Sequence, residues 1–158
     1  MKGYNENGLS ILNDRRAISF GVTFDSQGNN TKGSTGKFEC HGNIMSLLYG
    51  DDFEDKATIP SVYCFFLLFY SSEGLLTTPE LPATTLVNGC YGRMFEGCTN
   101  LNHITMLATD IPYDSCLEYW VDNVSSTGTF VKHPNMESLP TGCNGIPEGW
   151  TVIDYDVD

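Results

Sequence analysis

The chain has 158 residues, which is enough for one domain with a sizeable core or for a few stacked repeats. Twenty acidic residues against eight basic ones give a formal net charge of -12, which excludes the basic surface that nucleic acids and anionic membranes require. The most apolar run, SVYCFFLLFY at 61–70, is too short to span a bilayer, so we expect neither a nucleic-acid partner nor membrane insertion.

Residues 1–42 are expected to form a β-rich N-terminal cap. AISFGVTF at 17–24 mixes β-branched and aromatic residues in loose alternation, which is typical of a strand, and the polar stretch SQGNNTKGSTG at 26–36 indicates a turn. No apolar stretch or cleavage site of a signal peptide is visible at the start of the sequence. The export route therefore does not follow from these residues.

Three cysteines, Cys64, Cys90 and Cys116, are spaced evenly by 26 residues. A fixed period in this range is typical of stacked repeats. The same shift aligns further residues, namely Phe65 with Tyr91 and Leu117, Leu68 with Met94 and Trp120, Phe69 with Phe95 and Val121, and Ser72 with Cys98 and Val124. The sequence therefore predicts a solenoid of about three 26-residue repeats over residues 43–125.

Each repeat has apolar or small residues at i, i+3, i+4 and i+7, the spacing of one face of a helix about two turns long. Ser71, Gly97 and Asn123 come just before the end of this stripe. Glycine and asparagine tolerate the left-handed conformation in which helices end. The pattern predicts a short helix in every repeat, and two of the three repeats, those with Gly97 and Asn123, carry a stop signal at its end.

A strand is predicted after the helix, where Leu101, Ile104 and Met106 read L-x-x-I-x-M. The first repeat has Leu75, Thr78 and Glu80 at these positions, and its Leu81 corresponds to Leu107. In the third repeat, STGTFVKH at 126–133 puts Phe130 in the place of Ile104. Because the leucine pattern is lost there, we predict that residues 126–158 form a C-terminal β cap with WTVIDY as its last strand and an acidic tail.

The two ends of the chain resemble each other. STGKFECHGNIMSL at 34–47 and STGTFVKHPNMESL at 126–139 share Ser-Thr-Gly-x-Phe followed by a histidine. We interpret them as β segments that cap opposite ends of the stack, although a chance match in a chain rich in serine, threonine and glycine is the alternative.

The cysteines are best explained as small buried residues of the repeat core. No C-x-x-C spacing indicates a metal site, so we predict neither a metal nor a cofactor. A disulfide that joins Cys98 to Cys143, involves Cys40 or links successive members of the evenly spaced set Cys64, Cys90 and Cys116 stays open. The predicted core residues of the repeats are Cys64, Leu68, Phe69, Cys90, Met94, Phe95, Cys98, Leu101, Ile104, Cys116, Trp120 and Val121.

Few residues indicate chemistry. His41, His103 and His133 are scattered, and DDFED at 51–55 lacks the spacing of a calcium loop, so we interpret it as a solvated acidic loop. No nucleophile elbow, Walker loop or zinc-protease motif occurs, and we predict no catalytic residues.

Contact residues are instead expected on the exposed side of the predicted strands. If His103 faces outward there, Thr105 lies beside it on the same face, because alternate residues of a strand share a face. Thr77 and Glu80 are the candidates from the preceding repeat.

Several stretches resemble the BspA-like leucine-rich-repeat proteins of bacteria. These are CYGRMFEGCTNLNHITMLA, LTTPELPATTL, GTFVKHPNM and GIPEGWTV, within roughly residues 43–153, and the F-x-G-C-T-x-L unit at 95–101 is fairly specific to that group. The resemblance implies a right-handed α/β solenoid, usually exported, found at the cell surface and associated with adhesion or protein binding. The chain is shorter than many such proteins, which makes it a fragment, a compact member or one domain of something longer.

Together these observations predict a non-catalytic module that binds a protein or glycan through an exposed strand face, at the surface of a bacterial cell or outside it. The oligomeric state stays open. One alternative is a structural or attachment module of a larger adhesin or fibre. The other is a hydrolase, which needs a deep pocket gathering Asp51, Asp52 or Glu54 with a polar partner.

Overall fold

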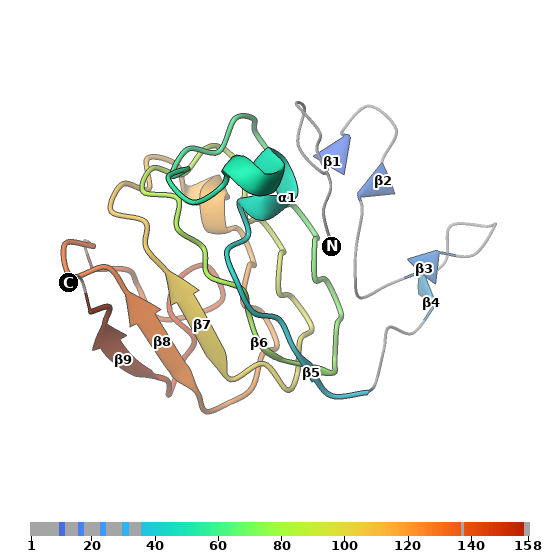
Figure 1. Cartoon of the computed structure of the whole chain (residues 1–158). Helices are drawn as coiled ribbons and strands as arrows, with labels where there is room; N and C mark the ends of the chain where they lie inside the picture. The colour runs from blue at the N-terminus through green and yellow to red at the C-terminus, as the bar shows by residue number, and fades with distance from the viewer. Residues whose placement is uncertain are drawn as a thin grey trace.

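The protein has an α/β structure built on a five-stranded parallel sheet (Figure 1). The computed structural model describes residues 36–136 and 138–156 and, before them, four two-residue strands. These four form two antiparallel pairs, β1 (Ser10–Ile11) with β2 (Arg16–Ala17) and β3 (Thr23–Phe24) with β4 (Asn30–Thr31). The sheet runs in the order β5 (Phe38–Glu39), β6 (Leu75–Thr77), β7 (His103–Met106), β8 (Thr129–Lys132) and β9 (Thr151–Asp154).

The strand predictions are confirmed where the pattern is clearest. In β7, Ile104 and Met106 are fully buried and alternate with half-buried residues. Ile104 lies directly opposite Phe130 of β8, which is the match expected from the sequence. The predicted last strand is β9, which has every residue exposed and lies at one edge of the sheet. The candidate at 17–24 overlaps β2 and β3, and its middle lies outside the described residues.

The predicted placement of the two similar end segments is right at one end and wrong at the other. Phe38 and Phe130 both lie in strands, and β5 forms an edge of the sheet. β8 is an interior strand, because β9 pairs with its outer side. The first segment also contains a helical turn, α1 (Ser46–Tyr49), rather than continuous β structure.

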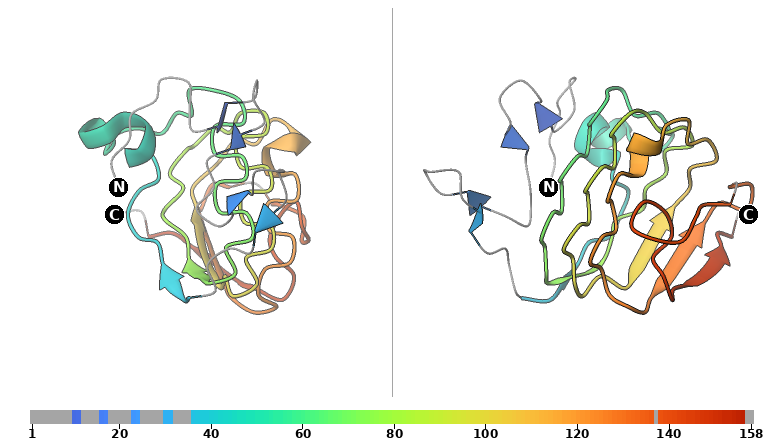
Figure 2. Two further views of the ribbon diagram at one scale, coloured as in Figure 1. Left: turned by 90° about the vertical axis from the view of Figure 1, so that its right-hand side faces the viewer. Right: turned by 180° about the vertical axis from the view of Figure 1, so that it is seen from behind.

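The helices predicted in the repeats are wrong. Residues 63–71, 88–97 and 116–123, which we call the turn ladder, consist mainly of consecutive turns, with only the short 3-10 helix Asp114–Leu117 at the start of the third segment. Backbone N–H groups in each segment alternate between two kinds of acceptor. Phe65 N donates to Cys90 O in the next segment at 3.0 Å, whereas Phe66 N donates to Tyr63 O within its own segment at 3.2 Å. Figure 2 shows the segments running side by side.

A left-handed residue at every fourth position explains why no helix forms. Tyr63, Leu67 and Ser71 have φ of 54°, 60° and 55° in the first segment, and a right-handed helix cannot continue through such residues. The predicted stops at Gly97 and Asn123 do have positive φ, 78° and 55°. The chain therefore adopts the expected left-handed conformation at these positions, but as part of a repeating turn rather than as a helix end.

The backbone hydrogen bonds between turn segments join residues 25 positions apart. Phe95 N donates to Trp120 O at 2.9 Å, which continues the pattern from the second segment to the third. Parallel bridges also join the segments that precede the turns, Thr58 to Thr85 and Thr85 to Asp110. Neighbouring stretches of chain are thus joined along the sheet, the turn ladder and the connection between them.

The hydrophobic core lies between the sheet and the turn ladder. Trp120 of the ladder packs edge-on against Phe130 of β8, with ring centroids 6.2 Å apart. Phe95 lies between Phe69 and Trp120, at 5.7 and 5.9 Å from their ring centroids. All the predicted core residues are at most 3% exposed, so the side chains that repeat in the sequence also meet in the interior.

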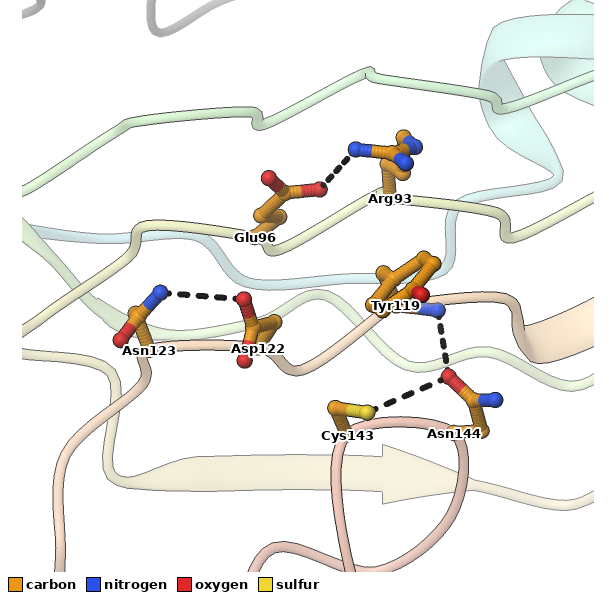
Figure 3. A network of polar contacts seen from close by, with 7 residues as sticks. All are labelled: Arg93, Glu96, Tyr119, Asp122, Asn123, Cys143 and Asn144. Carbon is orange, nitrogen blue, oxygen red and sulfur yellow. Dashed lines mark hydrogen bonds and ion pairs between the residues drawn. The ribbon is translucent and has the colours of Figure 1, made fainter.

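Polar side chains connect the turn segments on their outer side (Figure 3). Arg93 forms an ion pair with Glu96 at 2.9 Å, and its guanidinium carbon lies 4.8 Å from the ring centroid of Tyr119 in the next segment. The backbone N–H of Tyr119 donates to Asn144 Oδ1 at 2.7 Å. Asn144 thus supplies the acceptor for the third segment, where the turn ladder ends in the C-terminal loop.

Candidate functional site

A shallow cavity of about 440 Å³ contains all four predicted contact residues. This volume lies within the range of about 300–1,000 Å³ that is usual for small-molecule sites. Polar side chains dominate the lining, which consists of His41, Gly42, Asn43, Phe53, Thr77, Thr78, Glu80, His103 and Thr105. The cavity therefore gathers residues that lie far apart in the sequence.

Thr77, His103 and Thr105 come from neighbouring strands. Thr77 is directly opposite His103 in the parallel pairing of β6 with β7, and Thr105 follows two residues later on the same face of β7. All three are half-buried, while Ile104 between them points into the core and is fully buried. His103 Nε2 and Thr105 Oγ1 are 3.5 Å apart. The alternation of the strand thus places these three side chains on the face opposite the core.

Glu80 reaches the cavity because of one extra residue after β6. The 26-residue shift aligns Glu80 with Met106, but the structure pairs Leu81 with Met106, while Thr77 keeps its pairing with His103. The predicted match of Leu81 with Leu107 is therefore wrong by one position. Leu81 occupies the buried position, at 0% exposed, and Glu80 stays half-buried. An inserted residue of this kind re-aims the neighbouring side chain to the other face.

The segment that follows β5 supplies the other wall of the cavity. Asn43 bridges to Glu80, and two backbone hydrogen bonds support this bridge: Glu80 N donates to Gly42 O at 2.8 Å, and Ile44 N donates to Glu80 O at 3.0 Å. The Asn43 Oδ1 atom accepts a hydrogen bond from Met45 N at 2.8 Å, which fixes the side chain. The resemblance between the two end segments was the only sequence signal for this wall.

Phe53 lines the cavity from within the acidic DDFED cluster. Phe53 is half-buried, whereas Asp51, Asp52, Glu54 and Asp55 are exposed. None of the four carboxylates lines this cavity. The sequence analysis considered the acidic residues of this cluster and missed Phe53. The available signal was an aromatic residue placed among acidic ones.

The electrostatics of the cavity are set by one carboxylate and two imidazoles. Glu80 accepts a hydrogen bond from Tyr155 Oη at 3.2 Å, and the negative charge of Glu80 raises the pKa of Tyr155. His41 is exposed and lies 2.9 Å from Glu39. No lysine or arginine is among the described residues that line the cavity. The site is therefore neutral to acidic and rich in hydroxyl and amide groups.

Thr78 is the lining residue with an unsatisfied polar group. It is 5% exposed, and its Oγ1 atom is buried without a hydrogen-bond partner among the described residues. Its backbone N–H donates to His103 O at 3.1 Å, which holds the residue in place. A buried hydroxyl without a partner costs about 1–3 kcal/mol. The Thr78 hydroxyl is therefore an unsatisfied buried group next to the cavity.

The six cysteines are free thiols. Cys64, Cys90, Cys98 and Cys116 are buried, and Cys40 and Cys143 are half-buried. Burial raises the pKa of Cys90, and it raises the pKa of Cys98 to about 12, while a hydrogen bond from Cys90 acts to lower the pKa of Cys116. Cys98 Sγ donates to Phe69 O at 3.0 Å, which ties two turn segments together. The four buried cysteines are therefore core residues.

The three histidines of the sequence do not come together in one site. His41 and His103 line the cavity, whereas His133 accepts a hydrogen bond from Asn135 N at 3.0 Å in a turn after β8. Within residues 36–136 and 138–156, no three of the histidine, cysteine and acidic side chains lie together as a metal site. No helix in this part of the chain is long and apolar enough to cross a membrane.

Comparison of the chain with protein-family models, with curated proteins and with solved structures finds no match in any of the three.

Proposed function

We propose that the protein is a non-catalytic binding module that holds a protein or glycan ligand against the outer face of its parallel sheet. One observation carries the proposal: Thr77, Glu80, His103 and Thr105, which were selected from sequence as contact residues, line a single cavity on that face. The exposed faces of stacked repeats are their usual binding surfaces.

We further propose that the α/β fold is a short right-handed solenoid of about three 26-residue repeats like the leucine-rich-repeat proteins. The backbone bonds between turn segments support this, because they recur at a separation of 25 residues, one residue from the period in the sequence. The resemblance to BspA-like proteins motivates a role in adhesion at a bacterial cell surface or in the extracellular space.

The experiment is a binding assay with matched arginine substitutions. Labelled protein is applied to an array that carries glycans, glycoproteins and unglycosylated proteins. Thr105→Arg places a long charged side chain in the cavity, and Thr99→Arg makes the same change at an exposed position outside the cavity lining. We expect the first variant to lose binding by about tenfold or more, which corresponds to 1.4 kcal/mol, and the second to bind like the wild type.

Equal binding by both variants contradicts a role of this face. A wild-type protein that binds nothing on the array, at concentrations up to about 1 mM, contradicts the binding function itself, because even a weak site of about -4 kcal/mol is detected in that range. Circular dichroism of each variant checks that the fold is retained.

A structural or attachment role is the second candidate, and β9 favours it. All four residues of β9 are exposed, including Val152 and Ile153 at 41% and 47%. An edge strand with free backbone groups and apolar side chains can pair with another chain. Concentration-dependent association that Ile153→Lys abolishes, together with no ligand on the array, is the result that supports this role.

A further inference from the structure

We infer that the ligand of the sheet-face cavity is a neutral carbohydrate, held between hydroxyl, amide and carboxylate groups on one side and the ring of Phe53 on the other. The inference rests on the proposed binding function of this cavity and names its ligand class.

The lining offers many hydrogen-bonding groups for a small volume. Thr77 and Thr105 supply hydroxyls, Asn43 an amide and His103 an imidazole, and each can donate or accept. Glu80 supplies a carboxylate that only accepts when it is ionised. A sugar presents hydroxyl groups that donate and accept in several directions, so it can satisfy such a mixed set.

The aromatic ring at the edge of the cavity fits the same ligand. Phe53 is half-buried and packs against the core on one side. Phe53 also lines the cavity, where it is the only phenylalanine, tyrosine or tryptophan among the described lining residues. An aromatic ring gives an apolar surface of fixed shape, against which the C–H groups of a sugar ring can pack.

Charge and composition disfavour other ligand classes. A phosphate or an acidic sugar would meet the Glu80 carboxylate with no lysine or arginine among the described lining residues to balance it. An apolar peptide side chain would bury the hydroxyls and the carboxylate without partners, which costs about 1–3 kcal/mol for each group. A neutral ligand that forms hydrogen bonds avoids both costs.

The Thr78 hydroxyl lies beneath the surface and is not counted among the ligand-binding groups. Its Oγ1 atom is buried and has no partner in the described part of the chain.

The test compares a mucin-type glycoprotein with the same glycoprotein after enzymatic deglycosylation, and adds single sugars as competitors. The competitors are glucose, galactose, mannose, fucose and N-acetylglucosamine as neutral sugars, and sialic acid as an acidic one. We expect binding to be lost on deglycosylation, at least one neutral sugar to compete, and sialic acid not to compete.

Two variants in the cavity test whether its side chains set the affinity and the preference for neutral sugars, which a residue with only a structural role would not change. Phe53→Leu removes the ring and is expected to weaken sugar binding about tenfold, whereas Tyr113→Leu, at an exposed aromatic outside this cavity, is not. Glu80→Gln removes the charge, so it is expected to weaken neutral-sugar binding about tenfold and to improve sialic acid relative to the neutral sugars.

The outcomes distinguish failure of the carbohydrate inference from failure of the proposed binding function. Binding that survives deglycosylation but is lost in Thr105→Arg overturns the carbohydrate ligand and keeps the binding function. Competition by sialic acid as strong as by neutral sugars in the wild type overturns the neutral-ligand inference. No binding to either form of the glycoprotein, and none to the sugars measured directly by calorimetry, overturns the inference, and the array result then decides the binding function separately.

Discussion

We expect the substitution Tyr91→Phe to stabilise the protein. The Tyr91 side chain is 0% exposed, and its hydroxyl is buried with no hydrogen-bond partner in the part of the chain that the structure describes. Burial raises the pKa of Tyr91 well above the ordinary value of a phenol, so the hydroxyl is neutral near pH 7. The hydroxyl has therefore lost its hydrogen bonds to water and has gained none from the described residues of the protein.

The size of the effect follows from the packing around the ring. Leaving a buried polar group unpaired costs about 1–3 kcal/mol, and removing one oxygen leaves little empty space in return. The preceding turn segment already has phenylalanine at the corresponding position, and the rings of Phe65 and Tyr91 stack with centroids 6.0 Å apart. For a chain of this size each kcal/mol raises the melting temperature by about 2–4 °C, so we expect an increase of roughly 2–12 °C.

The measurement is urea unfolding followed by tryptophan fluorescence, with Phe65→Tyr as the reciprocal control. Because Phe65 is also 0% exposed, adding a hydroxyl there is expected to lower the free energy of unfolding by at least about 1 kcal/mol. A Tyr91→Phe protein that is less stable than the wild type by more than about 1 kcal/mol refutes the reasoning, since the hydroxyl would then have a partner in solution.

Further predictions concern the core, the turns and the thiols. Phe95→Ala, between two aromatic rings, should cost about 3–5 kcal/mol in urea unfolding, against about 0.5 kcal/mol for the exposed Tyr113→Ala; similar losses would contradict the ring stack. Ser71→Gly should raise the unfolding free energy by about 1 kcal/mol, because Ser71 has a φ of 55° where the next segment has Gly97; a loss would argue against the left-handed turn. Cys98 has a pKa raised to about 12, so its contribution to stability is complete below about pH 9 and is lost as the pH rises toward 12. The fall in stability between pH 8 and pH 10.5 should therefore be smaller in Cys98→Ala, and an unchanged slope would contradict this. A thiol reagent should modify the two half-buried cysteines of the native protein and reach the four buried ones only after unfolding; rapid reaction of all six would contradict the buried core.

The turn ladder shows why a repeat can be visible in sequence while its local structure is not. The buried residues Cys64, Phe65, Leu68, Phe69 and Ser72 recur at intervals of four. Over nine residues this period cannot be distinguished from the 3.6-residue period of a helix. The decision between them depends on hydrogen bonds to the neighbouring segment, such as Phe69 N to Met94 O at 3.0 Å. These bonds exist only after the segments have come together.

The sequence predicted only the part of the cavity that depends on local patterns. Alternation along a strand is a local property, so the common outward face of His103 and Thr105 followed from the sequence. The position of Glu80 depended on one extra residue after β6, whose effect is visible only in the pairing of Leu81 with Met106. Phe53 reaches the cavity from a loop, and no periodicity connects a loop residue with a strand.

The amino-acid sequence by itself determined the period, the buried side chains, the left-handed conformation at Gly97 and Asn123 and the outward face of the strands, because each follows from residue type and spacing along one segment. The tertiary structure alone decided that the ladder forms turns rather than helices, which strand closes the sheet, and which loop completes the cavity. These features depend on backbone hydrogen bonds and register between segments about 26 residues or more apart, and the free energy of such contacts has no counterpart in a local pattern.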